Sequence, residues 1–155
     1  MAIGGTTTEV SALADGAPTE FAHGLVGDEE IPSSFPMGDI VSIGYGGSSI
    51  FRLDGEAIRI GPESVGAAPG PACFGRGGSA PTITDALLLA GVLDADNYLG
   101  GELKLDPGLA EKVIGENIAE PLGLALGAAV QRMIAAYESQ VATHLRDILP
   151  SRGIA

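Results

Sequence analysis

Residues 61–78 of the chain read GPESVGAAPGPACFGRGG, and after two further residues the chain continues as PTITDA at residues 81–86. Residues 61–81 are rich in glycine and proline, and their apolar residues follow no helical or strand period. We therefore expect a long loop or a series of tight turns. A loop of this length is uncommon in a compact domain unless it has a function, so it is expected to bind a ligand or form an interface. A disordered linker is the alternative, but the apolar Cys73 and Phe74 argue against it, because a solvated linker buries no apolar surface.

Short strands and hairpins are expected before this segment, in residues 1–60. Each predicted strand is a short run of β-branched or apolar residues next to a turn signal. The predicted strands are residues 6–13, 19–26, 40–43, 50–53 and 57–60. Residues 15–18, DGAP, predict the turn between the first two, and residues 54–55, DG, predict the turn between the last two. Residues 28–30, DEE, are expected to form an exposed bend.

Helices are expected after the segment, in residues 82–155. Thr84 and Asp85 are predicted to cap a short helix at residues 86–92, because their side-chain oxygens can accept from unpaired first-turn amides. Asp106 and Pro107 are predicted to begin a second helix in the same way. The apolar face expected for this second helix consists of Leu109, Val113, Ile114 and Ile118.

The last predicted helix, residues 125–149, has the clearest pattern in the chain. Its apolar residues follow the i, i+3, i+4, i+7 spacing of an amphipathic helix. They are Leu126, Val130, Met133, Ile134, Tyr137, Val141, Leu145 and Ile148. Pro150 and Gly153 are expected to end the helix. We expect the apolar stripe to form the core of the domain or a docking surface.

Composition narrows the classes of function. The chain has 155 residues and a mass of 15.6 kDa, which suits one domain. Its net charge is −12, so it should repel nucleic acid and anionic lipid. Hydrophobic residues make up 45% and charged residues 18%, with a mean hydropathy of +0.29, which is typical of a chain that packs. Glycine is frequent and aromatic residues are only 5%, so part of the core is expected to form against a partner.

Localisation is expected to be cytoplasmic. The single cysteine, Cys73, cannot form an internal disulfide, so nothing favours an oxidising compartment. The first residues show no basic region followed by an apolar one, as an export signal would. No apolar run approaches the roughly 18 residues that a membrane-spanning helix needs.

Two glycine-rich segments are candidate phosphate-binding loops. Residues 3–8, IGGTTT, precede a β-branched run, so the backbone amides near Gly4, Gly5, Thr6 and Thr7 could surround a phosphate without obstruction by side chains. Residues 44–49, GYGGSS, allow a ligand or another chain to approach the backbone at Gly46 and Gly47. Ordinary flexible turns remain the alternative for both segments.

The residues most often used in catalysis form no recognisable set. His23 and His144 have no second ligand at metal-binding spacing, so structural or exposed roles are expected. Cys73 has no neighbouring base and is expected to be buried and inert. Asp85 is expected either to cap a helix or to orient a substrate or a metal-bound water. We assign no catalytic residue and no metal ligand to the chain.

Residues 61–78 together with residues 81–86 resemble the most recognisable stretch of the hydantoinase A and 5-oxoprolinase family. Residues 3–10 resemble the family's second phosphate loop, Asp-Val-Gly-Gly-Thr-Ser-Thr-Asp-Val. Residues 43–50 resemble its segment Ile-Gly-Ala-Gly-Gly-Gly-Ser-Ile. The order and spacing of these segments also match, so the resemblance covers nearly the whole chain.

The resemblance implies an α+β fold, part of an actin-like, sugar-kinase-like ATPase lobe. In that fold, phosphate loops from two lobes clamp ATP and Mg²⁺, and Gly4, Gly5, Thr6, Thr7, Gly46 and Gly47 would contact the nucleotide in this chain. The single domain, residues 1–155, would comprise a strand-rich part with the phosphate loop (1–60), the Gly/Pro-rich segment (61–81) and a helical part (82–155). It matches only the middle of the family's ATPase subunit, so the resemblance implies a split fragment completed by another polypeptide.

Separate small subunits of this kind occur in ATP-dependent ketone carboxylases of the superfamily. The resemblance therefore implies a small subunit of such an enzyme, with acetophenone, bicarbonate and ATP as substrates. Its partners would be larger hydantoinase A-like and hydantoinase B-like subunits. A subunit of an ATP-dependent cyclic amidase, as in hydantoinases and oxoprolinases, is an alternative.

Four positions depart from the family pattern. Ala2 and Glu9 replace the aspartates that begin and end the phosphate loop, Ser48 replaces a glycine, and Ala68 replaces an aspartate. The carboxylate expected to act on Mg²⁺ or water is therefore missing. A purely structural subunit with a degenerate nucleotide site is a further alternative.

Overall fold

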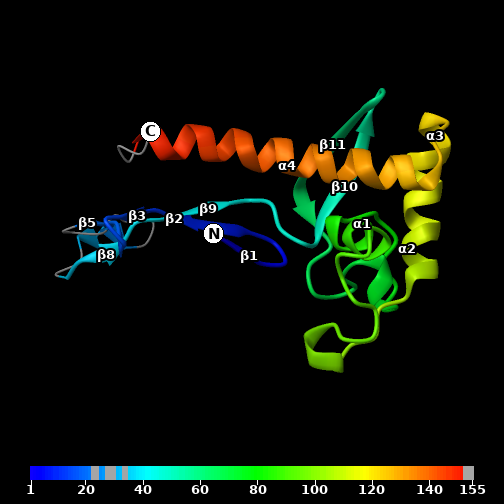
Figure 1. The fold of residues 1–155 in the computed structure, drawn as a ribbon, viewed down its shortest axis with the longest axis horizontal. Coiled ribbons are helices and arrows are strands. Elements are labelled where there is room, and N and C mark those ends of the chain that lie inside the picture. Colours follow the sequence, from blue (N-terminus) through cyan, green and yellow to red (C-terminus); the bar gives the residue numbers. More distant parts are fainter. Residues whose placement is uncertain (22–24, 27–30, 33–34, 152–155) are drawn as a thin grey trace.

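The computed structural model describes residues 1–21, 25–26, 31–32 and 35–151 (Figure 1). The strands are β1 (Ala2–Ile3), β2 (Thr8–Ser11), β3 (Leu13–Ala14), β4 (Ala17–Pro18), β5 (Glu20–Phe21), β6 (Leu25–Val26), β7 (Ile31–Pro32), β8 (Met37–Gly38), β9 (Ile40–Ile43), β10 (Ser49–Asp54) and β11 (Ala57–Ser64). The helices are α1 (Ile83–Leu89), α2 (Pro107–Ile114), α3 (Glu120–Leu122) and α4 (Leu126–Ser151). Helices and antiparallel strands are both present, as the expected α+β class requires.

The N-terminal strands form a narrow antiparallel ribbon in which β2 lies between β1 and β9. The turn predicted at residues 15–18 is confirmed, because Asp15 and Gly16 both have positive φ angles between β3 and β4. The predicted pairing of residues 6–13 with 19–26 is wrong beyond this turn. β2 pairs with β9 instead, with Thr8 opposite Ile43 and Val10 opposite Val41. This register buries Thr8 and Val10 on the same face of the ribbon. β5 and β6 pair onward with β8 and β7, and the bend predicted at 28–30 lies outside the described residues.

The hairpin predicted around residues 54–55 is confirmed as β10 and β11, with Gly55 at a φ of 60°. β11 continues to Ser64, four residues into the Gly/Pro-rich segment. The rest of that segment makes tight turns around a 3₁₀ turn, Ala72–Phe74. Residues 70–73 are buried, which contradicts the alternative of a disordered linker.

α1 begins earlier than the sequence predicted. Its N-cap is Thr82, not Thr84, and the Thr82 side chain accepts a hydrogen bond from the Asp85 amide. The Asp85 carboxylate accepts from the Thr82 amide in return, which completes a capping box. The three-residue spacing of Thr82 and Asp85 is the signature that the prediction overlooked.

α2 begins at Pro107 with Asp106 as its N-cap, as predicted, and continues through a π-helical turn, Gly115–Ala119, into α3. Val113, Ile114 and Ile118 are buried, but Leu109 is 37% exposed and does not belong to the buried face. Ala110 is fully buried and takes its place there. The smaller side chain allows α2 to approach Cys73 and Leu88 closely, and these residues share one apolar cluster with Ala110.

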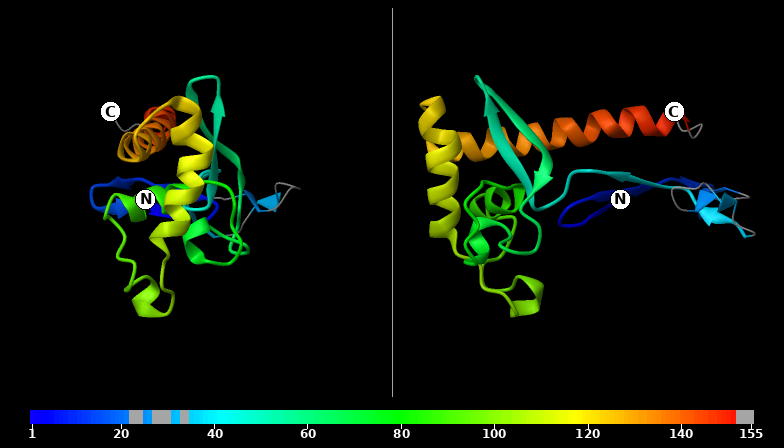
Figure 2. Two further views of the ribbon diagram at one scale, coloured as in Figure 1. Left: turned by 90° about the vertical axis from the view of Figure 1, so that its right-hand side faces the viewer. Right: turned by 180° about the vertical axis from the view of Figure 1, so that it is seen from behind.

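α4 confirms the predicted amphipathic stripe. Val130, Met133, Tyr137 and Val141 are buried in the main core together with Phe51 of β10. The helix does not end before Pro150 but continues to Ser151, since a proline in the last turn removes only one backbone hydrogen bond. Gly153 lies outside the described residues. Figure 2 shows that α4 projects beyond α1 and α2 and runs alongside the N-terminal ribbon.

In the part of the chain that the structure describes, no single helix is long and apolar enough to cross a membrane. Residues 107–122 and 126–150 reach that length and composition only as a pair bent by 92°.

Candidate functional site

The two glycine-rich segments meet at one point of the fold. Residues 4–7 form the tight loop between β1 and β2, closed by a 2.8 Å hydrogen bond from the Gly4 amide to the Thr7 carbonyl. The chain that leaves β9 passes over this loop. There the Gly47 amide donates to the Gly4 carbonyl at 2.9 Å, and the Ser48 amide donates to the Gly5 carbonyl at 2.6 Å. The structure thus joins the two predicted phosphate-binding segments through backbone hydrogen bonds.

Close approach of the two backbones explains the glycine at position 46. A Cβ atom on Gly46 would lie 2.6 Å from the carbonyl oxygens of both Gly4 and Gly5. Real Cβ contacts do not occur at this distance, so any other residue would push the loop away. The start of α1 is tied to the same point, because the Thr84 hydroxyl donates to the Gly47 carbonyl at 2.8 Å.

A pocket of about 440 Å³ opens beside this junction. Its volume is in the range of small-molecule sites. Its lining combines small or hydroxyl-bearing residues with apolar residues that include two aromatic rings. The first set is Gly4, Gly5, Thr6, Gly47, Ser48, Gly66, Ala67 and Thr84, and the second is Ile3, Phe74, Leu87, Leu93 and Tyr98.

Four of the six predicted nucleotide-contacting residues line this pocket, namely Gly4, Gly5, Thr6 and Gly47. The other two do not. The Thr7 hydroxyl instead donates to the Glu9 carboxylate at 2.6 Å. Gly46 has a packing role, and its amide donates to the Ser49 hydroxyl at 2.9 Å.

Two backbone donors in the pocket have no partner among the described residues. The amides of Gly5 and Thr6, at the tip of the loop, donate to no atom of the described chain, and both residues are exposed. Ser48 also lines the pocket, and 6% of the residue is exposed. Accessible turn amides beside a hydroxyl fit an anionic oxygen such as that of a phosphate.

Sequence reasoning missed the contribution of Ser48. The sequence presents it only as a departure from the family's glycine, whereas the structure gives it a hydroxyl that reaches the pocket. It also missed Phe74 and Tyr98, which are distant in sequence from the glycine loops. Only Ser48 carried a signal in the sequence, because it stands directly after the glycine pair 46–47.

The pocket carries no formal charge, because none of its lining residues is Asp, Glu, Lys or Arg. A phosphate held by these residues would therefore be bound by N–H dipoles and hydroxyls alone. The residues do not fit a metal ion. Within the described ranges, no three His, Cys, Asp or Glu side chains lie together as metal ligands would. Glu9 accepts hydrogen bonds from Thr7 at 2.6 Å and from Ser42 at 3.4 Å and does not line the pocket.

Asp85 and Cys73 form a buried structural pair beneath the pocket. The Asp85 carboxylate accepts from the Cys73 amide at 2.8 Å, the Thr82 amide at 3.0 Å and the Thr82 hydroxyl at 2.7 Å. Its capping role is therefore confirmed. Burial, and then the charge of Asp85, raise the pKa of the Cys73 thiol. The thiol stays protonated and fully buried, in agreement with the inert role predicted for it.

The described histidine has a structural environment. The ring of His144 packs edge-to-face on Tyr45, with the ring centroids 5.3 Å apart, and its Nδ1 lies 2.9 Å from the Gln140 carbonyl. His23 lies outside the described residues.

Known proteins resemble this chain in sequence and fold. The hydantoinase/oxoprolinase family profile matches residues 1–155. The acetophenone carboxylase gamma subunit of Aromatoleum aromaticum is 37% identical over 79% of this chain. The caprolactamase alpha subunit of Pseudomonas jessenii is 35% identical over 97% of it. A solved nucleotide-free structure of acetone carboxylase, from work on ATP-dependent acetone carboxylation, covers 99% of the chain with a TM-score of 0.80 and 32% identity.

The matched region is a small part of each of these proteins. The chain spans 17% of the gamma subunit, 22% of the caprolactamase subunit and 22% of the acetone carboxylase chain.

Proposed function

Because this chain belongs to the hydantoinase/oxoprolinase family, we propose that it supplies a phosphate-binding edge of the nucleotide site in a multi-subunit, ATP-dependent enzyme. The observation that carries the proposal is the meeting of the two glycine-rich segments at a pocket of about 440 Å³, lined by Gly5, Thr6 and Ser48, where the Gly5 and Thr6 amides have no partner in the described chain. Donors that are held in place before the ligand binds stabilise charge on a phosphoryl group without reorganisation. Phosphoryl transfer depends largely on such positioning and electrostatic stabilisation.

The reaction proposed for the whole enzyme is the ATP-dependent carboxylation of a ketone, acetophenone with bicarbonate giving benzoylacetate. Two relatives support this class, the acetophenone carboxylase gamma subunit and acetone carboxylase. ATP would activate the reactants by phosphorylation. This chain would orient the phosphoryl oxygens and would not move a proton itself, since no carboxylate, imidazole or amine side chain lines the pocket. We place the enzyme in the cytoplasm, where ATP and bicarbonate are available.

Mg²⁺ would accompany ATP, and its carboxylate ligands would come from outside this chain. Ala2 stands where the family has an aspartate, and it lies at the exposed start of β1. The proposed partners are therefore larger hydantoinase A-like and hydantoinase B-like subunits. Together they would supply the metal-directed carboxylates and the rest of the nucleotide site.

Two other functions have specific support. The missing carboxylate favours a purely structural role, in which another copy of the phosphate loop performs the chemistry. The caprolactamase subunit, which matches 97% of this chain, favours ATP-dependent opening of a cyclic amide. Both alternatives keep the family and the fold and differ only in the chemistry.

Variants in the assembled enzyme separate the site-completing role from the structural one. Thr6→Ala and Ser48→Ala each remove the hydroxyl of a residue that lines the pocket, and Thr7→Ala removes a hydroxyl outside the pocket. We expect kcat for ATP cleavage to fall about tenfold or more in the first two, by comparison with losses of single transition-state donors, and to change little in the third. Unchanged kcat in Thr6→Ala and Ser48→Ala, with intact assembly, would leave the structural role.

The substrate class needs a second measurement. The purified assembly is tested for ATP cleavage with acetophenone plus bicarbonate, and separately with caprolactam, hydantoin and 5-oxoproline. Stimulation by the ketone alone supports the carboxylase, and stimulation by a cyclic amide alone supports the amidase. The mass of the polypeptide that carries this sequence, read from the same preparation, tests whether it is a separate small subunit.

A further inference from the structure

An apolar groove runs along α4 beside α1. Two hollows of about 330 and 360 Å³ form it, and Ile134 lines both of them. α1 contributes Leu89 to the first hollow and Leu87 to the second. The α4 residues of the groove recur every three or four positions and so form one stripe. They are Leu126, Val130, Ile134, Tyr137, Val141 and Leu145. We call this surface the α1–α4 groove, and it follows α4 for about 28 Å at 1.5 Å per residue.

The groove has a packed base and an uncovered rim. Val130, Tyr137 and Val141 are at most 8% exposed and belong to the main core. The apolar residues of the rim pack against that core but are only half-buried, namely Leu87, Leu89, Leu126, Ile134 and Leu145. At the β1 end of the second hollow, Met1 is 64% exposed and Ile3 is 54% exposed. A contiguous apolar surface of this kind is stabilised when another apolar surface covers it.

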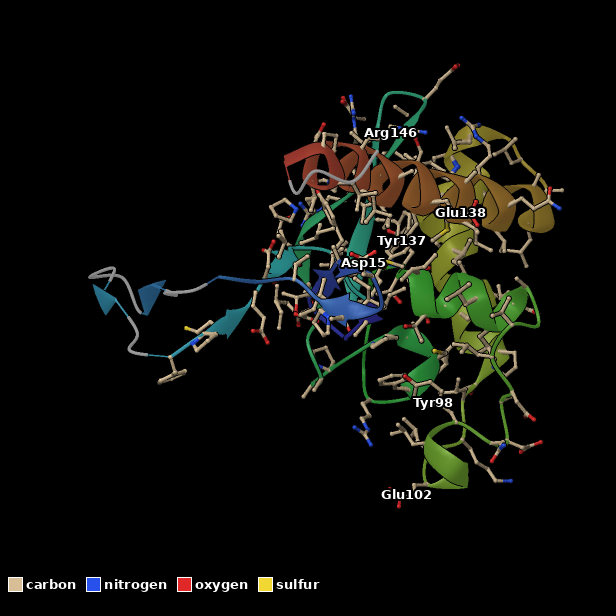
Figure 3. The ribbon with its side chains drawn as sticks, turned by 60° about the vertical axis from the view of Figure 1, so that its left-hand side comes forward. Asp15, Tyr98, Glu102, Tyr137, Glu138 and Arg146 are labelled. Carbon is tan, nitrogen blue, oxygen red and sulfur yellow. The ribbon has the colours of Figure 1, made fainter. Side chains whose placement is uncertain are left out.

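The charge of the groove has one sign. Glu111 lines the first hollow and Glu138 the second, and no other charged side chain of the described residues lines either one. Arg146 of α4 lies on the side away from Tyr137 (Figure 3). A second copy of this chain, with its own net charge of −12, would bring the same carboxylates to the groove and be repelled. A segment with lysine or arginine beside its apolar residues would instead be attracted.

The shape of the groove fits a helix better than a strand. Side chains of a third helix can insert between the rows of side chains that α1 and α4 present. A helix also pairs its own backbone groups internally. A strand laid across two helices would leave its N–H and C=O groups without backbone partners.

We infer that the α1–α4 groove is the docking site for an amphipathic helix of a partner subunit. The apolar side of that helix would cover the α4 stripe, and its lysine or arginine residues would face Glu111 and Glu138. The inference rests on the proposed function, because it takes the helix to belong to another subunit of that enzyme. It adds which surface of this chain the partner occupies and what charge the occupying segment carries.

Two synthetic peptides of about 20 residues, the helix length that matches the groove, test the inference on the full chain. Both have leucine at every third or fourth position, and one has lysine beside the leucines where the other has glutamate. Fluorescence anisotropy measures their binding. We expect the lysine peptide to bind at least about tenfold more tightly than the glutamate peptide.

Filling the groove from within should block this binding. Gly127 lines the first hollow, and a Cβ atom there would meet nothing within 4 Å, so a tryptophan side chain can enter the groove without a clash at its base. Gly127→Trp should weaken the lysine peptide at least about tenfold, as the loss of a central apolar contact does. Ser139→Trp, at an exposed position of α4 outside both hollows, is the matched control and should change nothing. Ala142→Trp fills the second hollow and replaces Gly127→Trp if circular dichroism shows that the latter does not fold.

Reversing the two carboxylates tests the charge of the occupant. Glu111→Lys combined with Glu138→Lys should remove the preference for the lysine peptide. Glu102→Lys combined with Asp147→Lys makes the same change of net charge at exposed positions outside both hollows and should keep the preference.

The assembled enzyme provides the last measurement. In its native mass spectrum, Gly127→Trp should release a subunit that Ser139→Trp retains. Equal binding of the two peptides, wild-type binding or complete assembly in both Gly127→Trp and Ala142→Trp, or a preference that survives the reversal of Glu111 and Glu138, overturns the inference. Self-association that Gly127→Trp abolishes also overturns it and assigns the groove to a second copy. None of these measurements involves nucleotide, so ATP cleavage by the Thr6→Ala and Ser48→Ala enzymes still decides the proposed function by itself.

Discussion

Replacing Gly46 by alanine should displace the loop that carries the pocket donors. The added Cβ would lie 2.6 Å from the Gly4 and Gly5 carbonyl oxygens, so the loop must move by about 0.8 Å to reach the 3.4 Å of ordinary contact. That shift lengthens the hydrogen bonds from the Gly47 and Ser48 amides, now 2.9 and 2.6 Å. Each bond contributes about 1 kcal/mol, and overpacking costs about 1–3 kcal/mol. We expect the free energy of unfolding to fall by about 2–4 kcal/mol.

The effect on activity should exceed the effect on stability. A misplacement of about 1 Å in a positioned group can lower turnover by about a hundredfold, so kcat for ATP cleavage should fall between tenfold and a hundredfold in enzyme that still assembles. Urea unfolding of the chain and steady-state ATP cleavage by the assembly measure the two quantities.

Gly44→Ala is the matched control for this substitution. Gly44 lies two residues earlier in the same segment, and a Cβ atom there would meet nothing within 4 Å. Its stability and turnover should match the wild type within about 0.5 kcal/mol, as for a surface change. If Gly46→Ala behaves like Gly44→Ala in both measurements, the close approach of the two segments does not position the donors and the reasoning is wrong.

Four further changes test the packing beneath the pocket. Asp85→Asn should lower the unfolding free energy by about 2–4 kcal/mol in urea titrations, because a buried carboxylate that accepts from Cys73 and Thr82 gives way to a group with one acceptor. Tyr137→Phe should raise it by about 1 kcal/mol, because the buried hydroxyl has no partner within the described residues; a decrease would mean that a partner exists. Val130→Glu should prevent folding, as seen by circular dichroism, because Val130 is 5% exposed and belongs to the core. The raised pKa of the Cys73 thiol predicts stability that is complete below the ordinary thiol pKa of about 8.5 and declines as pH rises above it; Cys73→Ala should flatten that decline, and an equal slope would contradict it.

Local signals in the sequence predicted much of the fold. Strand residues 40–43, the hairpin turn at 54–55 and the apolar stripe of α4 were all predicted correctly, because each depends on a short period or a turn dipeptide. The main error was the partner of β2. Residues 8–11 pair with residues 40–43 across more than twenty intervening residues, and no local pattern records such a contact. Val130 illustrates the same limit. The helical period predicted that it lies on an apolar face, but it did not tell whether that face packs in the core of this chain or against a partner; the structure places it in the core.

The sequence predicted the glycine loops of the candidate site but not its aromatic residues. The glycine runs at residues 4–5 and 46–47 signal close backbone approach, and the structure brings them together by hydrogen bonds. The aromatic pair Phe74 and Tyr98 gives no such signal, because the two rings meet only after the Gly/Pro-rich segment has turned back. On α4 the helical period alone predicts which side chains face the core. Figure 3 shows Tyr137 on the side toward the body of the protein and Arg146 on the opposite side.

The charge of the chain determines how it can take part in nucleotide chemistry. The pocket has donors but no cation, and the whole chain carries a net charge of −12. At about 10 Å in water each pair of like unit charges repels by about 0.4 kcal/mol, so a polyphosphate gains no electrostatic attraction from this chain as a whole. In the proposed enzyme, the N–H and O–H groups at Gly5, Thr6 and Ser48 would orient the phosphoryl oxygens, whereas the phosphate charge would be neutralised by Mg²⁺ and by cationic groups of partner subunits. If the chain orients the phosphate and its partners neutralise it, phosphate affinity should appear only in the assembled enzyme.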